Sequence, residues 1–298
     1  MSRQTTIQTN PAHVLDQPVR WVGFMLILMV SLTIGLIAFP TPLLADSVNS
    51  IQPMVSVGDF HNCAVQVDGT ISCWGGNFQR GDSVPTGTFT QVSAGSSHNC
   101  AVKTDGTLAC WGGNNNFGQL NAPAGTFTQT SAGFHHSCAI RADGSLTCWG
   151  RNTYNQLKAP SGSFTQVSAG GVHSCALDVE ENIKCWGWYA DGQIFAPSGT
   201  FTQVSAGDFH SCAVRSDGRL ACWGDNRWGQ LNAPSGTFIS VSAGSFHNCA
   251  IKTNGTIACW GDTGSTESSI PAGTYSQVSS SAWRNCAVKS DESIVCWE

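Results

Sequence analysis

The sequence predicts an all-β protein, a seven-bladed β-propeller with blades of about 37 residues, preceded by an N-terminal signal peptide or signal anchor. Three observations lead to this prediction. Fourteen cysteines recur at regular intervals, 33 glycines accompany only 11% charged residues, and no helical periodicity occurs after residue 45. A chain of 298 residues is long enough for a large domain with its own core, so a disulfide-held miniprotein is excluded.

The first 45 residues have the order of a secretory signal. A polar segment with Arg3 and Arg20 precedes the almost entirely apolar residues 21–39, and a short segment then ends at Ala45. This order predicts cleavage after Ala45. An uncleaved membrane anchor over residues 21–39 is the alternative, because nineteen apolar residues nearly span a bilayer. Either way, the remainder is expected to be secreted or at the cell surface, where cysteines stay oxidised.

The remaining chain has the wrong charge for a nucleic-acid or membrane-surface binder. Removal of residues 1–45 takes away Arg3, Arg20 and Asp16, which leaves 12 basic and 18 acidic residues and a net charge of −6. Binding to phosphate backbones or anionic lipid needs clustered Lys and Arg, whereas the basic residues here are scattered. A membrane contact is therefore expected only if the N-terminal segment is uncleaved.

An internal repeat is the strongest signal in the sequence. The first cysteine of each copy recurs every 37 or 38 residues, the second lies ten residues later, and these pairs use all fourteen cysteines. We expect a short linker at 46–51 and a propeller at 52–298, with repeats at about 52–88, 89–126, 127–163, 164–200, 201–237, 238–274 and 275–298.

Each copy contains three short stretches with β character. In the fifth copy they read FTQVSA, HSCAVR and RLACWG, and the later stretch GQLNAP is a candidate fourth, outer strand. Seven units of three or four antiparallel strands favour a propeller. A parallel β-helix is the alternative, and it is disfavoured because the Asp-Gly turns join adjacent strands as hairpins.

The register of the hairpin decides whether the cysteines can pair. A two-residue loop at Asp105-Gly106 would send the two cysteines of that copy to opposite faces of the sheet. A three-residue loop that begins at Thr104, with a glycine bulge, places Cys100 opposite Cys110. This register also gathers the apolar residues on one face. We therefore predict seven disulfides, each within one copy: Cys63–Cys73, Cys100–Cys110, Cys138–Cys148, Cys175–Cys185, Cys212–Cys222, Cys249–Cys259 and Cys286–Cys296.

The cysteines allow two other interpretations, and two of the turns depart from the repeat. The cysteines could be buried, reduced hydrophobic residues, whereas structural zinc is disfavoured because no cysteine pair is two to four residues apart. Glu180-Glu181 and Asp291-Glu292 replace the Asp-Gly turn in the fourth and seventh copies. A different turn or a strained backbone is expected there, because glycine adopts positive φ most easily.

A histidine recurs two residues before the first cysteine in six copies, and Arg284 takes its place in the seventh. A ring of metal-binding histidines is one interpretation. A hydrogen bond from each histidine to a neighbouring strand or loop is the interpretation that we favour, because a residue repeated in every blade normally serves the blade. The tryptophan that follows each second cysteine is expected to pack between blades or at their rims.

Function is expected where the copies differ. The loops between the first and second strands and the segments after the third strand emerge on the same face of a propeller, opposite the Asp-Gly turns. Polar residues such as Arg151, Asp191, Asp225 and Arg227 are interspersed there with aromatic residues, a mixture suited to a protein interface. The aromatic candidates for partner binding are Phe60, Phe78, Phe117, Phe134, Tyr154, Trp188, Tyr189, Phe209, Trp228, Phe246 and Trp283.

The stretch VSAGDFHSCAVRSDGRLACWGDNRWGQL resembles the repeat of the regulator of chromosome condensation family, in its Gly-x-x-His, Asp-Gly and Trp-Gly-x-Asn-x-x-Gly-Gln-Leu elements. The resemblance covers about residues 52–298 and implies a seven-bladed propeller. The short unit and export signal look more like a secreted bacterial branch that includes the propeller-type β-lactamase inhibitor. Copies one, six and seven depart from the Asn-x-x-Gly-Gln ending, which predicts that these blades lack the short outer strand.

The leading functional prediction is an exported, disulfide-stabilised, monomeric module that binds an extracytoplasmic protein. An enzyme inhibitor of the β-lactamase-inhibitor type and a glycan-binding propeller are alternatives, and guanine-nucleotide exchange is a remote one by family analogy. The sequence contains neither HExxH nor GxSxG, so it gives no catalytic residues, and it indicates no metal or cofactor.

Overall fold

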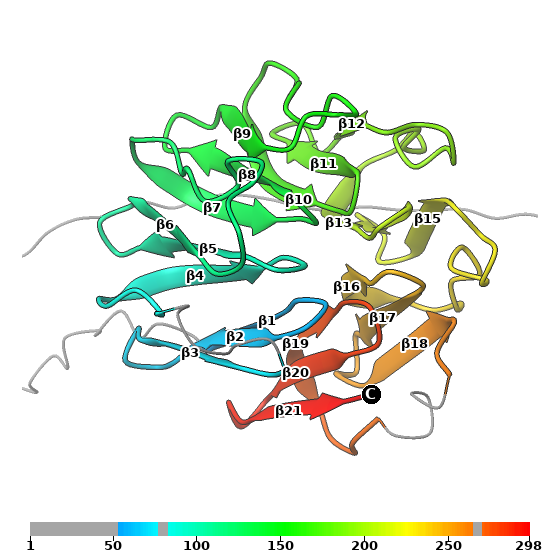
Figure 1. Ribbon diagram of the computed structural model, residues 1–298. Helices are drawn as coiled ribbons and strands as arrows, with labels where there is room; N and C mark the ends of the chain where they lie inside the picture. Colours follow the sequence, from blue (N-terminus) through cyan, green and yellow to red (C-terminus); the bar gives the residue numbers. More distant parts are fainter. Residues whose placement is uncertain (1–52, 77–82, 265–269) are drawn as a thin grey trace, which may run out of the picture. The chain divides into compact units, whose positions relative to one another are not determined.

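The computed structural model describes residues 53–76, 83–264 and 270–298. The predicted signal, the linker and Phe78 lie outside these residues. Every regular element of the described chain is a β-strand, and the strands form seven three-stranded antiparallel sheets. Each sheet comes from one sequence repeat, and Figure 1 shows the sheets following one another in chain order around a common centre. The predicted seven-bladed propeller is confirmed.

Each blade has an inner, a middle and an outer strand in chain order. The inner strands are β1 (Met54–Val57), β4 (Phe89–Ala94), β7 (Phe127–Ala132), β10 (Phe164–Ala169), β13 (Phe201–Ala206), β16 (Phe238–Ala243) and β19 (Tyr275–Ser280). The middle strands are β2 (Asn62–Val65), β5 (Asn99–Lys103), β8 (His136–Arg141), β11 (His173–Asp178), β14 (His210–Arg215), β17 (His247–Lys252) and β20 (Asn285–Lys289). The outer strands are β3 (Ile71–Trp74), β6 (Leu108–Trp111), β9 (Leu146–Gly150), β12 (Ile183–Gly187), β15 (Leu220–Gly224), β18 (Ile257–Gly261) and β21 (Ile294–Trp297).

The middle and outer strands have the predicted hairpin register. In the second blade Cys100 lies opposite Cys110, and Val102 lies opposite Leu108. All seven predicted disulfides are present, and no described cysteine is free. The three-residue turn ends at Gly106, whose φ is 81°. The reduced-cysteine interpretation is therefore wrong for this structure.

The fourth and seventh hairpins keep the same turn without glycine. Glu181 and Glu292 occupy the position of Gly106, with φ values of 64° and 68°. The amide of Glu181 still donates to the carbonyl of Asp178 at 3.1 Å. Of the two expectations for these turns, the strained backbone is correct, because L-residues with a Cβ disfavour positive φ.

The candidate fourth strand is a turn in the described blades. In the second blade Gln119 Oε1 accepts a hydrogen bond from the amide of Phe117, and Asn115 Oδ1 accepts one from the amide of Leu120. These side-chain contacts use backbone donors that a strand ladder would need. The Asn-x-x-Gly-Gln-Leu segment therefore folds on itself.

The hydrophobic core is distributed over the interfaces between neighbouring blades. One cluster joins Cys138 and Ile140 of the third blade to Phe164, Val167 and Trp186 of the fourth. Equivalent clusters lie between the other neighbouring pairs of blades. A single blade therefore exposes half of a core until its neighbour covers it.

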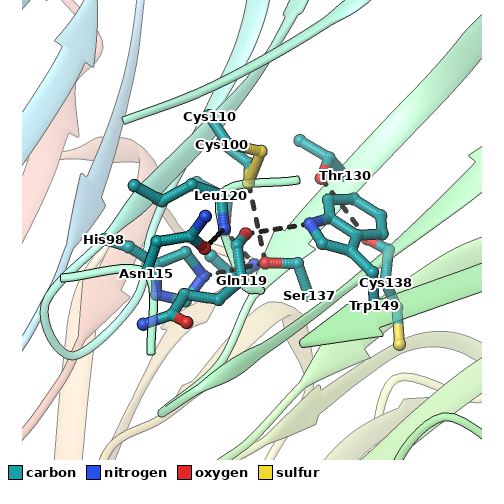
Figure 2. The surroundings of a disulfide bond; sticks show 12 residues. His98, Cys100, Cys110, Asn115, Gln119, Leu120, Thr130, Ser137, Cys138 and Trp149 are labelled. Atoms are coloured by element: carbon teal, nitrogen blue, oxygen red, sulfur yellow. Dashed lines mark hydrogen bonds between the residues drawn. A yellow bond between two sulfur atoms is a disulfide. The ribbon is translucent and has the colours of Figure 1, made fainter. Parts of the chain in front are cut away.

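The repeated tryptophan contributes a directed contact to this packing. Trp149 Nε1 donates to the carbonyl of Gln119 in the preceding blade at 2.9 Å (Figure 2). The same bond joins Trp186 to Gln156, Trp223 to Gln193 and Trp260 to Gln230. The expected packing between blades is observed, and the Gln-containing turn is one side of it.

The repeated histidines also join neighbouring blades. His98 Nε2 lies 2.8 Å from Ser137 Oγ of the next blade (Figure 2), and five more histidines make the same contact with an Asn or Ser. Among the described residues, no group of three metal-ligating side chains is close enough to hold a metal ion. The hydrogen-bonding interpretation of the histidines is therefore confirmed.

Polar side chains of the inner strands hold the ring together. At all seven blade interfaces a serine hydroxyl accepts a hydrogen bond from a backbone amide of the next inner strand, at 2.9–3.0 Å. At five of them a glutamine two residues earlier accepts another amide. Inner strands of neighbouring blades share no strand ladder, so these side chains satisfy backbone groups that would otherwise be exposed at the edge.

The seventh blade meets the first without exchanging a strand. Gln277 Oε1 accepts the amide of Val55, and its Nε2 donates to the Val55 carbonyl at 3.0 Å. Ser279 Oγ accepts the amide of Val57. Strand β19 therefore lies beside β1, 222 residues away along the chain (Figure 1).

Candidate functional site

The face opposite the hairpin turns carries the predicted partner-binding residues. It consists of the loops between inner and middle strands and the segments after the outer strands, and we call it the loop face. A groove is lined by Phe134 and Phe209 from the first set of loops and by Tyr154 and Trp188 from the second. The two sets therefore meet on one face, as the strand directions predicted.

In blades two to five, the segment after the outer strand is a turn around a buried glutamine. Gln119, Gln156, Gln193 and Gln230 are fully buried at the centres of these turns. Each accepts, through Oε1, the amide of the residue two positions earlier. Those residues at the tips of the turns are Phe117, Tyr154, Asp191 and Trp228. The shared geometry of the turn thus presents a variable side chain, because only the glutamine and its neighbours pack inward.

Ten of the eleven predicted aromatic residues are described, and all ten retain some solvent exposure. Phe60, Phe117, Phe134, Tyr189, Trp228 and Trp283 are exposed, by 39–65% of their surface. Tyr154, Trp188, Phe209 and Phe246 are half-buried. The loop face therefore carries large apolar side chains that the propeller core does not cover.

Most of these residues gather at two places on the loop face. The first aromatic cluster consists of Phe117, Phe134, His135, Tyr154, Trp188 and Tyr189, linked by ring contacts of 4.7–6.3 Å and by Arg151. The second aromatic cluster consists of Trp228, Phe246 and Trp283, with centroid distances of 6.3 and 5.3 Å. Phe209 lines the groove, which lies beside the first aromatic cluster. Phe60 makes no ring contact with a member of either cluster.

The groove beside the first aromatic cluster has a volume of about 440 Å³. This is within the range of small-ligand and side-chain pockets. Its lining comes from the third, fourth and fifth blades: Phe134, His135, Arg151, Tyr154, Gly171, Val172, Trp188, Asp191, Asp208, Phe209 and Arg227. It combines aromatic walls with both hydrogen-bond donors and acceptors.

Of the two arginines that line the groove, Arg227 has a carboxylate partner and Arg151 has none among the described residues. Arg227 Nε donates to Asp225 Oδ1 at 2.9 Å, and although burial acts to raise the pKa of Asp225, this ion pair and its hydrogen bonds lower it. Arg151 Nε donates to the Thr153 hydroxyl at 3.0 Å, and no carboxylate among the described residues forms an ion pair with Arg151. Arg151 is therefore a cation of the groove that has no acidic partner among the described residues.

Two further titratable groups line the groove. Burial, and then the charge of Asp59, raises the pKa of Asp208 to about 6. Burial, and then the Arg151 charge, lowers the pKa of His135, so this imidazole is neutral at pH 7. Asp208 sits at the edge of the small axial opening, where it shares the lining with Asp59.

Sequence reasoning found the aromatic residues and Arg151 but missed Asp208, Gly171 and Val172. The second residue after the inner strand, which follows a glycine in six copies and Ser281 in the seventh, varies among Asp, Ser, Phe, Gly and Ala. A variable position between nearly constant residues is the feature of the sequence that could have indicated Asp208 and Gly171 as residues of the groove. His135 directly precedes the repeated histidine of its copy, and its ring lies 5.0 Å from Phe117 and 4.7 Å from Phe134.

Comparison with solved structures places the fold among known propellers. The CRINKLY WD40 ectodomain of the Arabidopsis thaliana receptor kinase ACR4 is 23% identical, with a TM-score of 0.69 over 82% of this chain and 96% of that one. The entire ectodomain of the Physcomitrella patens receptor kinase CR4 is 26% identical, with a TM-score of 0.70 over 83% and 74%. Prp20p from Saccharomyces cerevisiae is 19% identical, with a TM-score of 0.62 over 70% and 71%.

Sequence comparisons identify the repeat. No curated protein sequence matches the chain. The model of the regulator of chromosome condensation (RCC1) repeat matches five segments, at residues 89–119, 127–156, 164–193, 201–230 and 238–265, which together make up half of the chain. These segments begin at the inner strands of blades two to six. The chain therefore belongs to the RCC1 repeat family.

Proposed function

We propose that this protein is an extracytoplasmic binding module that recognises another protein through its loop face. The observation that carries the proposal is the pair of aromatic clusters on that face. Six of the predicted aromatic side chains are exposed and do not belong to the buried core of the propeller. Tyr189, for example, is 65% exposed and Trp283 is 55% exposed. Exposed apolar patches of this kind are typical of interaction sites.

The residue types in the clusters suit a protein interface. Trp, Tyr and Arg contribute most to binding free energy when an interface excludes water around them. The backbone amides of Phe117, Tyr154 and Trp228 are held by buried glutamines, so these three segments lose little backbone entropy when a partner covers them. Aromatic side chains on an ordered backbone favour a protein partner.

An extracytoplasmic location is supported by the seven disulfides, because such bonds persist in oxidising compartments. Two of the similar folds are ectodomains of plant receptor kinases. Within residues 53–76, 83–264 and 270–298, no helix is long and apolar enough to cross a membrane. Cleavage after Ala45, or anchoring by residues 21–39, remains part of the proposal.

A role in binding rather than catalysis is supported by the propeller neighbours. Prp20p, the yeast RCC1, has binding properties to Gsp1p and histones, and its structure bound to Kap60 has been solved. By analogy, a propeller of this family serves as a platform for protein contacts. Inhibition of a secreted enzyme would be one form of such binding.

The test compares proteins captured by the immobilised, oxidised full-length chain with those captured by a variant. The variant carries Trp228→Ala and Trp283→Ala, which remove exposed rings from the second aromatic cluster. The control carries Val67→Ser and Val179→Ser, because these valines are 60% and 63% exposed beside the hairpin turns on the opposite face. Extracytoplasmic fractions supply the candidate partners, and mass spectrometry identifies them.

A specific protein that is captured by the parent and the control but lost by the aromatic variant is the expected result. Thermal unfolding of all three proteins checks that the substitutions leave the propeller folded. Identical captures by the parent and both variants would contradict binding through the second cluster and would reject the loop face if first-cluster variants behaved in the same way.

A further inference from the structure

The groove of about 440 Å³ beside the first aromatic cluster contains a cation that is fixed in orientation. The guanidinium carbon of Arg151 lies 5.3 Å from the ring centroid of Phe117 and 5.6 Å from that of Tyr154. Its Nε donates to Thr153 Oγ1 at 3.0 Å. Contacts with two rings and one hydroxyl restrict the rotamers of a side chain that is normally mobile.

The terminal nitrogens of Arg151 have no acidic partner among the described residues. A guanidinium offers a planar pair of N–H groups that matches the two oxygens of a carboxylate. The hydrogen bond to Thr153 uses Nε, and the two terminal nitrogens make no hydrogen bond among the described residues. Arg151 is therefore oriented for a bidentate contact with an anion that enters the groove.

The surrounding carboxylates disfavour a doubly charged anion. Arg227 already pairs with Asp225, and Trp188 Nε1 donates to Asp191 Oδ2 at 3.4 Å inside the groove. Asp191 and Asp208 both line the groove. A doubly charged phosphate would be repelled by these carboxylates more strongly than a carboxylate would.

The walls of the groove favour an apolar group next to that anion. Tyr154 and Trp188 contact each other at 4.7 Å with their planes at 65°, and Phe209 lines the groove with them. All three side chains are half-buried, so they form walls rather than protrusions. A flat or branched apolar side chain of a partner would bury its surface against them.

We infer that this groove binds a protein segment in which an aromatic or aliphatic side chain is adjacent to an Asp or Glu. The apolar side chain packs against Tyr154, Trp188 and Phe209, and the carboxylate pairs with Arg151. This inference rests on the proposed function, because it names the chemistry of the partner at one part of the loop face.

The experiment selects peptides from a displayed random dodecapeptide library on the immobilised, oxidised full-length protein. The peptides that are enriched are synthesised in pairs, with Asp or Glu in one and Asn or Gln in the other, and their Kd values are measured by calorimetry. The protein variants are Arg151→Gln and Arg151→Lys. Arg141→Gln is the matched control, because this guanidinium lies 5.0 Å from the ring centroid of Phe127 at the opposite end of the blade.

The expected peptides contain an apolar residue beside an acidic one. Their affinity should fall about 10- to 100-fold on amidation or with Arg151→Gln, as expected for loss of a charged hydrogen-bonded pair. Arg151→Lys should lose part of the affinity, because it keeps the charge without the planar pair of donors. Arg141→Gln should bind like the parent, and thermal unfolding of each variant verifies its fold.

Other outcomes would overturn the inference in distinguishable ways. Peptides without acidic residues, insensitive to Arg151→Gln but lost with Trp228→Ala, would refute carboxylate recognition and leave the proposed loop-face function standing. Arg151-dependent binding of uronic-acid oligosaccharides on a glycan array, without peptide binding, would replace the protein partner with a glycan. Binding that depends on neither the first nor the second cluster would reject both proposals.

Discussion

At the residue scale, the glycine that follows the inner strand is required by a contact with the next blade. A Cβ added to Gly133 would lie 2.2 Å from the carbonyl oxygen of Gly170, and Gly58, Gly95, Gly170 and Gly207 would meet the next glycine's carbonyl oxygen at 2.1–2.3 Å. These glycines do not have positive φ. Close approach of the backbones, rather than conformational freedom, therefore explains the repeated Ser-Ala-Gly.

The variant Gly133→Ala tests this explanation. The added methyl group would be only 2.2 Å from a backbone oxygen and 3.0 Å from His136 Cε1, so two blades would have to separate slightly. We expect the free energy of unfolding to fall by about 1–3 kcal/mol, as for other overpacked sites. Urea unfolding of the oxidised protein measures the change.

Gly76→Ala is the control for that comparison, because no atom of the described residues lies within 4 Å of its added Cβ and its φ is not positive. Its free energy of unfolding should differ little from that of the parent. Equal stability of Gly133→Ala and Gly76→Ala would refute a steric role for the glycines that follow the inner strands.

The residue scale also shows which contacts a single sequence can predict. Pairing of Cys100 with Cys110 followed from the turn between them, because hairpin register is a local property. The contact of Gly133 with Gly170 was not predicted, because it joins residues 37 positions apart in different blades. Its only trace in the sequence is the constancy of the glycine, which a turn would explain equally well.

At the element scale, six of the seven middle strands begin at a histidine or directly after one. Burial lowers the pKa of five of these histidines and so favours their neutral form. In three blades the imidazole Nε2 contacts an Asn Oδ1, an acceptor, so Nε2 carries the proton. The Nδ1 atoms of His98, His136, His173, His210 and His247 are buried and make no hydrogen bond among the described residues. Protonation would therefore place a charge on a buried nitrogen without an acceptor.

This arrangement predicts loss of stability in acid. Burial, and then the neighbouring histidines, lowers the pKa of His136 to about 3 and that of His98 to about 4. The unfolded chain binds these protons near pH 6.5, so the free energy of unfolding falls as the pH decreases from about 6.5 to about 3. The slope is at most about 1.4 kcal/mol per pH unit for each histidine.

Urea titrations between about pH 7 and pH 4 measure this slope. His136→Gln removes one of these protons, so it should reduce the slope by at most about 1.4 kcal/mol per pH unit. This holds even if the variant is less stable than the parent at pH 7. His135→Gln is the neighbouring control and should reduce it less, because His135 is only half-buried. The raised pKa of Asp208 acts with the opposite sign, since its protonation near pH 6 relieves a buried charge. An unchanged slope in His136→Gln would refute the assignment.

At the scale of the whole propeller, the sequence predicted the blade number and the loop face but not how the blades are joined. Repeats and hairpin turns determine the blade and the directions of its strands, so the positions of Phe117 and Trp228 on one face followed. The grouping of rings into two clusters was not predictable. It depends on which loops of neighbouring blades lie side by side, as His135 and Phe117 do.

The glutamines of the inner strands illustrate the same limit. Gln91, Gln129, Gln166, Gln203 and Gln277 look like ordinary solvent-facing residues of an alternating strand, yet each hydrogen-bonds the backbone of the next blade. Ser240 occupies the equivalent position in the sixth blade, and its hydroxyl makes no hydrogen bond among the described residues. The interface of blades six and seven therefore lacks this contact.

The interface of blades seven and one depends most on such contacts. Every other pair of neighbouring blades is also connected by the chain, whereas Gln277 and Ser279 join β19 to β1 without a connecting loop or an exchanged strand. Opening at this interface therefore loses only non-covalent contacts. We expect it to be where the propeller opens first.

Gln277→Ala tests this expectation beside Gln166→Ala, which removes the equivalent contact to the Val204 amide at 2.8 Å. Both should lower the free energy of unfolding by about 1–3 kcal/mol, because a buried backbone amide loses its acceptor.

Hydrogen exchange should distinguish the two variants. In Gln277→Ala the amides of β1 and of β19 should lose protection together, since separation of the two blades exposes both strands at once. In Gln166→Ala the loss should be confined to the neighbourhood of Val204, because the chain still connects the fourth and fifth blades. Equally local loss in both variants would mean that packing of Val55 and Val57 against Cys286 and Val288 suffices to keep the ring closed.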